Sequence, residues 1–235
     1  MLVMNEAVQA LFRWKGAIKH DTEPVYRPSY EAGVLLNEAT IGCSHHANRS
    51  APRSGDKPFS AVFLSQIQED LLEVRSYYGN GVKQIILVTG DAFALPTRDL
   101  KGIGKLITSI FPRIDTISMY ASIRNIKDKT DEELLALRAL KLNDFNIGVD
   151  SGSEAALAFF DEGFPLHEAK EQLLRLKRLG CCYSINLMLG AGDRGKGLES
   201  ARANALLANL VQSRLIFGSP LHVDRGSALG RLIQA

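Results

Sequence analysis

The chain has 235 residues, of which 46% are hydrophobic and 23% charged, and its formal net charge is +2. This length suffices for one large α/β domain with its own core, and so mild a charge without a basic run gives no nucleic-acid signal. Residues 1–25 are interpreted as an N-terminal extension. Residues 1–11 have no basic start and only a short, interrupted apolar stretch, so they predict no signal peptide. No window approaches about 18 uninterrupted apolar residues. We therefore expect a cytoplasmic protein without a membrane span.

Six short apolar runs, each ending at glycine and polar residues, alternate with helical patterns along the chain. The strands are predicted at 34–41, 84–89, 116–120, 145–149, 183–189 and 215–218. The helices are predicted at 64–78, 98–110, 131–140, 154–161, 166–179 and 199–210. Thr97 is a plausible N-cap of the second helix, Thr130 with Glu133 forms a capping box for the third, and Ser153 can cap the fourth.

Repeated strand–helix alternation predicts an α/β fold with parallel strands. Two architectures are compatible with it: an open doubly wound sheet, and a partial (β/α)6 TIM-like barrel formed by residues 26–235. In both, ligands bind at the carboxyl ends of the strands. The function is therefore expected to depend on the short polar clusters that follow each run.

Two of these clusters carry a carboxylate directly after an apolar strand. Thr89-Gly90-Asp91 combines a flexible backbone with an acceptor for an ammonium or hydroxyl group, or is a simple turn with a capping Asp. Asp150-Ser151-Gly152-Ser153 places a carboxylate where burial is costly without a partner, and its serines can also cap the next helix. Both clusters are candidate ligand sites, with a purely structural alternative for each.

The remaining clusters are less specific. Side-chain alternation would place Tyr120, Ser122 and Arg124 on one face, with Arg124 able to meet a carboxylate. The glycine-rich segment 190–197 fits neither a dinucleotide fingerprint nor a P-loop, and is interpreted as a loop that lets a ligand approach the strand end. His222 and Asp224 are too irregularly placed to establish a catalytic pair.

The three cysteines do not form a disulfide framework. Cys43 follows the first strand, where a thiol can be a nucleophile, a metal ligand or a packed side chain. Cys181 and Cys182 begin the fifth strand. At about 3.3 Å per residue they lie roughly 20 Å or more from its carboxyl end, so we expect them to be buried packing residues.

In the order of its strand-end segments, the chain resembles the radical S-adenosylmethionine superfamily over residues 26–235. The segments that carry the resemblance are Tyr26-Arg27-Pro28, Gly42-Cys43-Ser44-His45, Gly90-Asp91-Ala92, Tyr120-Ala121-Ser122, Ile147-Gly148-Val149-Asp150-Ser151-Gly152-Ser153, Asn186-Leu187-Met188-Leu189-Gly190-Ala191-Gly192 and Ser219-Pro220-Leu221-His222-Val223-Asp224. The resemblance implies a partial barrel that binds S-adenosylmethionine. It also implies a [4Fe-4S] cluster, an electron donor and a small-molecule substrate that the sequence does not identify.

The resemblance also implies roles for individual residues. Gly90 and Asp91 correspond to the segment that receives the methionine ammonium, with Asp91 one methylene shorter than the usual Glu. Asp150 corresponds to the carboxylate that binds the ribose hydroxyls, with Ser151 beside it, and Ser122 belongs to the third strand end. Leu189 and Gly190 correspond to the segment along the adenine. Cys43 corresponds to the first cluster ligand.

The loop after Cys43 departs from the family's cysteine motif. The usual spacing places the other two ligands at Ala47 and Ser50, and a related spacing places them at Asn48 and Ala51. None of the four is cysteine, and Fe–S iron prefers soft thiolates. Two hypotheses follow: a radical enzyme with an impaired cluster, and a non-catalytic descendant that acts as a nucleoside-binding or scaffold module. The composition of 46–57 would also be expected of a local reading-frame error.

Overall fold

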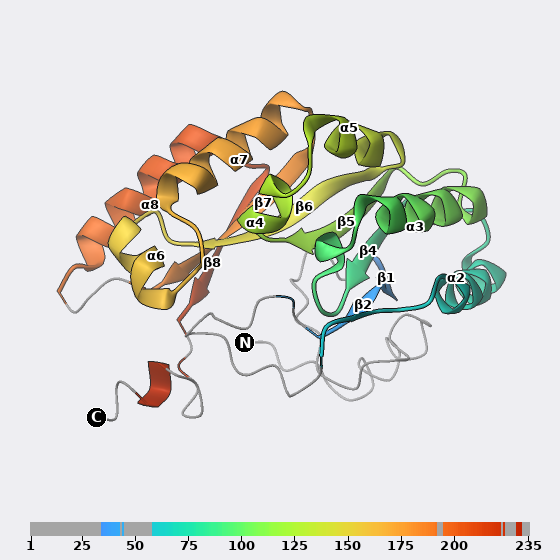
Figure 1. Ribbon diagram of the computed structural model, residues 1–235, viewed down its shortest axis with the longest axis horizontal. Helices are drawn as coiled ribbons and strands as arrows, with labels where there is room; N and C mark the ends of the chain where they lie inside the picture. Colours follow the sequence, from blue (N-terminus) through green and yellow to red (C-terminus); the bar gives the residue numbers. More distant parts are fainter. Residues whose placement is uncertain are drawn as a thin grey trace. The chain divides into compact units, whose positions relative to one another are not determined.

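The computed structural model describes residues 34–42, 44, 58–191, 195–221, 223 and 229–231. Six strands form one sheet with the order β1-β4-β5-β6-β7-β8 (Figure 1). The strands are β1 (Leu35–Glu38), β4 (Gln84–Val88), β5 (Thr116–Ala121), β6 (Leu142–Asp150), β7 (Cys182–Leu189) and β8 (Leu215–Pro220). The pairs β1–β4, β4–β5, β6–β7 and β7–β8 are parallel. Each strand follows its predecessor without the reversal of a doubly wound sheet, so the predicted partial barrel is confirmed.

The helices occupy the predicted places between the strands, except for one short helix after β5 that was not predicted. They are α2 (Leu64–Tyr78), α3 (Thr97–Ile110), α4 (Ile123–Lys127), α5 (Asp131–Ala139), α6 (Glu154–Phe160), α7 (Leu166–Arg178) and α8 (Gly197–Val211), with a 3₁₀ turn η2 (Ala92–Ala94). In the described part of the chain the sheet has β1 and β8 as its edges and does not close. No helix among the described residues combines the length and the apolar character that crossing a membrane requires.

The chain divides into two compact units, and the first contains β1, β4, β5, α2 and α3. Its helices bury apolar stripes, of which Ile67, Leu71 and Ile107 are fully covered. Helix α2 ends where Gly79 adopts φ +56° and donates its N–H to the Arg75 carbonyl at 2.8 Å. Glycine tolerates this conformation, so the predicted glycine stop is confirmed.

The second unit contains most of β6 together with β7, β8, α4, α6, α7 and α8. Helices α7 and α8 lie along one face of these strands (Figure 1). The side chains on that face are apolar and buried: Phe145, Ile147, Val149, Tyr183, Ile185 and Leu187. The Tyr183 hydroxyl donates to the Val211 carbonyl at 2.7 Å, and burial raises its pKa to about 12. Every second residue of β6 and β7 therefore faces away from the helices.

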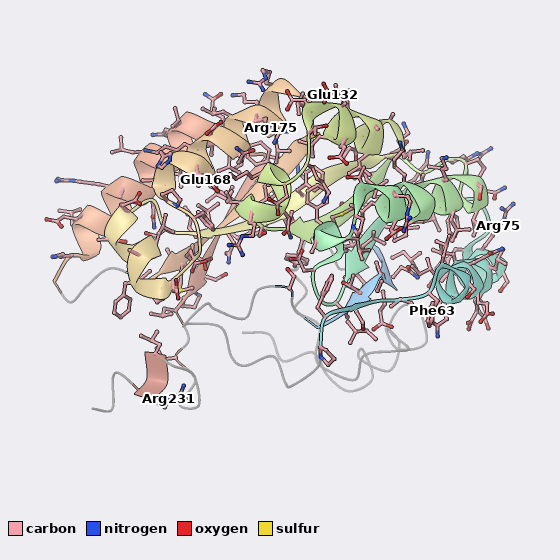
Figure 2. The ribbon with its side chains drawn as sticks, in the orientation of Figure 1. Phe63, Arg75, Glu132, Glu168, Arg175 and Arg231 are labelled. Atoms are coloured by element: carbon pink, nitrogen blue, oxygen red, sulfur yellow. The ribbon has the colours of Figure 1, made fainter. Side chains whose placement is uncertain are left out.

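Arg175 on α7 binds the segment between α4 and α5 through hydrogen bonds (Figure 2). Its guanidinium donates to the carbonyls of Ile126 and Lys129 at 3.1 and 2.6 Å, and it also pairs with Asp131. The hydrogen bond from Arg175 lowers the pKa of Asp131. A planar guanidinium can satisfy several acceptors at once, so one side chain fixes the start of α5.

Three local predictions need correction. The predicted strand 34–41 breaks at Ala39, because the chain leaves the parallel sheet and β2 (Thr40–Ile41) pairs antiparallel with β3 (Ser60–Ala61). Thr97 is the first helical residue of α3, and Pro96 occupies the N-cap. Ser153 is at the N-cap of α6 but makes no side-chain cap bond. The predicted extension 1–25 lies outside the described residues.

Candidate functional site

In the first unit, the end of β4 is held in a strained backbone conformation. Thr89 has φ +62°, a region that a β-branched residue rarely adopts. Two reciprocal bonds hold it: Thr40 Oγ1 donates to the Thr89 carbonyl at 2.8 Å, and Thr89 Oγ1 donates to the Thr40 carbonyl at 2.6 Å. Strain of this kind persists where the surrounding structure fixes it, and it clusters at functional sites.

Gly90, the next residue, is required by packing. It has φ +58°, and a Cβ there would lie 2.2 Å from the Gly42 carbonyl oxygen and 2.8 Å from Thr40 Oγ1. Asp91 follows, is 8% exposed, and precedes η2 without a side-chain cap bond. The capping alternative for Asp91 is therefore wrong, and its role as a ligand group stays a prediction.

The end of β5 differs from the sequence prediction. Ser122 caps α4, accepting the Asn125 N–H on its Oγ at 3.1 Å. The chain turns into a helix at this point, so Tyr120, Ser122 and Arg124 do not alternate along a strand, and that prediction is wrong. Arg124 is exposed on α4. The Ser122 oxygen is engaged in its own backbone, and a ligand role for it stays a prediction.

In the second unit, β6 ends in a tight turn around Asp150. The Ser151 N–H donates to the Val149 carbonyl at 2.7 Å, and Asp150 between them has φ +65°. This is a γ-turn of the rare, strained hand. The pairing with β7 shifts register between Gly148 and Asp150. Such irregularities re-aim a side chain at the end of a strand.

Among the described residues, the space next to the carboxyl group of Asp150 is little occupied on the side of Gly148. Gly148, two residues earlier, is exposed, and among the described residues a Cβ at that position would meet only Asp150 Oδ1, at 3.8 Å. Burial raises the pKa of Asp150, and a hydrogen bond with the Glu162 side chain opposes this in part. A ligand can therefore approach a desolvated carboxyl group over the bare backbone of Gly148.

Nothing in the sequence indicated that Glu162 is a partner of Asp150. The position of Glu162 depends on the way in which α6 ends. Its N–H donates to the Leu157 carbonyl at 3.2 Å, and the Asp161 N–H donates to the Ala158 carbonyl at 3.3 Å. This is a Schellman ending, with Asp161 rather than glycine in the left-handed conformation, at a cost of about 1 kcal/mol. A glycine at position 161 would have indicated this helix ending in the sequence, whereas an aspartate does not.

Asn204 on α8 is a second partner that the sequence did not indicate, and it anchors the turn after Asp150. The Gly152 N–H donates to Asn204 Oδ1 at 2.7 Å in a buried bond. A Cβ at Gly152 would lie 2.3 Å from the Ala203 carbonyl oxygen, so this glycine permits close packing. Ser151 is fully buried and its Oγ accepts the Ser153 N–H at 3.1 Å. The segment after Asp150 is therefore fixed.

The end of β7 presents an apolar side chain next to a flexible residue. Leu189 is 53% exposed, and Gly190 has φ +89°. The Leu189 carbonyl accepts the Leu221 N–H at 2.8 Å, and its side chain lies 3.1 Å from where a Gly218 Cβ would stand. An exposed leucine fixed in this way offers a surface on which a flat ring could pack.

The face of β6–β7–β8 that is turned away from the helices carries polar side chains. This polar face was not predicted from the sequence. Asn146 and Ser184 are paired in register, and Asn186 follows two residues after Ser184. Ser184 Oγ is buried without a hydrogen-bond partner in the described part of the chain, and Asn186 Oδ1 accepts the Ser219 hydroxyl at 2.9 Å. Polar residues at alternate positions of otherwise apolar strands were the available signal.

The predicted cluster ligand Cys43 lies outside the described residues, as do His45, His46, His222 and Asp224. Among the residues that are described, no three His, Cys, Asp or Glu side chains are grouped to hold a metal ion. Cys181 is buried, as predicted, but Cys182 is exposed. The loop 43–57 contains one thiol in sequence. This donor set does not fit a [4Fe-4S] cluster, because the protein normally supplies several thiolates to such a cluster.

Comparison with known proteins identifies the fold. No protein-family model and no curated protein matches the chain. Its structure is similar to that of TsrM from Kitasatospora setae, a radical S-adenosylmethionine methyltransferase solved with cobalamin and a [4Fe-4S] cluster. The TM-score is 0.67 at 13% identity, over 91% of this chain and 42% of that one.

Two further solved structures are similar over most of the chain. Methylornithine synthase (PylB) gives a TM-score of 0.62 at 12% identity, over 97% of this chain and 64% of that one. Coproporphyrinogen III oxidase (HemN) from Escherichia coli, a radical S-adenosylmethionine enzyme, gives 0.56 at 17% identity, over 89% and 47%. This chain spans less than two thirds of each. These likenesses establish the radical S-adenosylmethionine fold that the strand-end segments predicted.

Proposed function

We propose that this protein, whose fold is that of solved radical S-adenosylmethionine enzymes, binds S-adenosylmethionine at the carboxyl end of β6. In this proposal Asp150 accepts hydrogen bonds from the ribose hydroxyls. The observation that carries it is the strained turn at Asp150, φ +65°, which holds a desolvated carboxyl group beside the open backbone of Gly148. A carboxylate can accept two hydroxyl donors, and strain is retained where function requires it.

Other described residues have assigned parts in the same proposal. Leu189 offers its exposed side chain to the adenine, and the positive φ of Gly190 turns the chain beside it. Gly152 and Asn204 hold the turn after Asp150, with Ser151 buried beneath it. Asp91, in the first unit, is a separate proposal: a buried carboxyl group able to accept hydrogen bonds from an ammonium group.

Calorimetric titration with S-adenosylmethionine tests the binding. We expect a dissociation constant between about 1 μM and 1 mM. Asp150→Asn should weaken it by about tenfold, since a hydrogen bond to a charged group is replaced by one to a neutral amide. Asp115→Ala, an exposed carboxylate paired with Lys83, is the matched control and should bind like the parent. Full-strength binding by Asp150→Asn would contradict the assignment.

The second candidate function is cluster-free: a nucleoside-binding or scaffold module without radical chemistry. It is favoured by the single thiol of the loop 43–57. A bound cluster would supply the electron that cleaves S-adenosylmethionine to a 5′-deoxyadenosyl radical, whereas the residues described here only bind and position.

Reconstitution with iron and sulfide tests whether the chain carries out radical chemistry or is cluster-free. After anaerobic incubation with iron and sulfide and desalting, we expect clearly substoichiometric iron, no thiolate–iron absorption and no 5′-deoxyadenosine with a reductant. A Cys43→Ala variant is the matched control and should look the same. Four irons per chain, lost in Cys43→Ala, would show that the chain builds a cluster and would favour a radical enzyme over the cluster-free module.

A further inference from the structure

The polar face of β6–β7–β8, opposite to α7 and α8, carries groups that the proposed function does not use (Figure 1). Asn146 of β6 and Ser184 of β7 are register partners, and Asn186 follows on the same side of β7. Ser184 is fully buried, and in the part of the chain that the structure describes its Oγ has no hydrogen-bond partner. Such a hydroxyl lowers the stability of a fold unless a bound molecule satisfies it.

A hydrogen bond from the neighbouring strand holds the amide of Asn186. The Ser219 hydroxyl of β8 donates to Asn186 Oδ1 at 2.9 Å. The amide oxygen is thereby engaged, and the amide offers its two N–H groups. None of the described residues accepts a bond from them. Asn186 is half-buried, so a ligand can reach these donors. Asn186 therefore requires an acceptor from its ligand.

Gly148 leaves space beside Asn186. The two residues are register partners in adjacent strands, which lie about 4.8 Å apart. Gly148 is exposed, and among the described residues a Cβ there would meet only Asp150 Oδ1, at 3.8 Å. A ligand can therefore lie over the backbone of Gly148 and contact the side chain of Asn186.

The charged side chains of these three strands stand only at the ends of the polar face. Asp144, at the amino end of β6, pairs with Arg214 at 2.9 Å, and Asp150 is the last residue of β6. Strands β7 and β8 contain no charged residue. An anionic ligand would lose its hydration here without a cation from these strands to replace it, whereas a neutral ligand needs only hydrogen bonds.

Apolar side chains border these polar groups. Phe217 of β8 is the register partner of Asn186 and is half-buried. Met188, two residues after Asn186, packs against an apolar cluster that includes Phe160 of α6. A ligand with an apolar skeleton and few polar atoms fits such a border better than a polyhydroxylated one.

We propose that the polar face binds a substrate with a neutral amide group on an apolar skeleton. The amide carbonyl of the substrate accepts from Asn186, which Ser219 positions, and its N–H donates to Ser184 Oγ. Ser184 is covered in the free protein, so this contact requires a rotamer change of a neighbouring side chain, which is common on binding. This inference rests on the proposed function, because it names the second ligand of a protein that binds S-adenosylmethionine at the end of β6.

Ligand-detected NMR titration with benzamide, benzoate and benzylamine tests the ligand class. For benzamide we expect a dissociation constant on the order of 1 mM, and for benzoate at least about tenfold weaker binding. Asn186→Asp keeps an acceptor for the Ser219 hydroxyl but has no N–H donors. It should lose most of the benzamide affinity and gain affinity for the cation benzylamine.

Asn209→Asp, at an exposed amide of α8, is the matched control and should bind all three probes like the parent. Equal affinities of the parent for benzamide and benzoate, or no benzamide binding, would overturn the inference. Displacement of benzamide by S-adenosylmethionine would assign Asn186 to the S-adenosylmethionine site and would overturn it as well.

A ligand-free measurement keeps this inference distinguishable from the proposed function. Ser184→Ala removes a buried hydroxyl that has no described partner. It should raise Tm by about 2–4 °C and yet weaken benzamide binding about threefold. Ser118→Ala is the matched control for stability. Ser118 is also buried, on β5, but Gln84 Nε2 donates to its Oγ at 3.0 Å, so its loss should lower Tm.

A lower Tm for Ser184→Ala would mean that its hydroxyl supports the fold, and an unchanged benzamide affinity would mean that it does not contact the ligand. Either result would overturn the inference. If the parent failed to bind S-adenosylmethionine but showed the amide preference and the two opposite Tm shifts, the proposed function alone would fail.

Discussion

Gly90→Ala should destabilise the first unit by about 3–5 kcal/mol. Two costs add. Alanine at φ +58° costs about 1–2 kcal/mol. The new Cβ would also lie 2.2 Å from the Gly42 carbonyl oxygen, so the backbone that follows β2 and the backbone that follows β4 must move apart. That movement breaks the reciprocal Thr40–Thr89 bonds, and Asp91 shifts with it.

Gly79→Ala separates the clash from the backbone conformation. Gly79 has φ +56°, close to that of Gly90, but nothing lies within 4 Å of its Cβ position. Urea denaturation should give a loss of about 1–2 kcal/mol for Gly79→Ala and clearly more for Gly90→Ala. Equal losses would mean that the close approach of Gly42 to Gly90 is not a feature of the folded protein.

The elements that the sequence predicted best are those with purely local causes. Helix α2 has the predicted bounds, because an apolar stripe is followed by glycine. The capping box of α5 is confirmed: the Thr130 N–H donates to Glu133 Oε2 at 2.9 Å, and the Glu133 N–H donates to Thr130 Oγ1 at 3.2 Å. Both patterns lie within a few residues of sequence, where spacing alone determines which groups meet.

The partners of the candidate site could not be predicted in the same way. Asn204 lies 52 residues after Gly152, and only the packing of α8 brings them together. A carboxylate directly after an apolar strand is expected to need a partner, but the described partner of Asp150 is a second carboxyl group, Glu162. Nothing in the local sequence indicates that contact, because Asp161 stands where a helix-ending glycine would be expected.

The two strand ends with candidate carboxylates share one physical feature. Thr89, before Asp91, and Asp150 itself are non-glycine residues with positive φ, in different units of the chain. A glycine at either position would relieve the backbone strain, so each of these side chains has a cost in folding free energy. The Thr89 hydroxyl offsets its cost through the bond to Thr40. Among the described residues, the side-chain partner of Asp150 is another carboxyl group, Glu162, which does not offset the cost in the same way.

Asp150→Asn should therefore stabilise the fold at neutral pH, by on the order of 1 kcal/mol, or about 2–4 °C in Tm. Asparagine tolerates positive φ better than most residues, and its amide can still bond to Glu162 without burying a charge. Burial raises the folded pKa of Asp150 above its ordinary 3.8, so the native state binds the extra proton. The parent thus loses stability as pH rises from about 4, and the advantage of Asp150→Asn should grow over that window.

Asp144→Asn is the matched control, since Asp144 is a buried carboxylate on the same strand. Its Oδ2 accepts a bond from Arg214 at 2.9 Å. Neutralising it removes a charge-assisted bond and should cost about 1.5–3 kcal/mol. Thermal unfolding at pH 4 and pH 7 should thus move Tm in opposite directions for the two variants. A destabilised Asp150→Asn at neutral pH would mean that the Asp150 carboxylate supports the fold, and it would remove the physical ground for assigning it to a ligand.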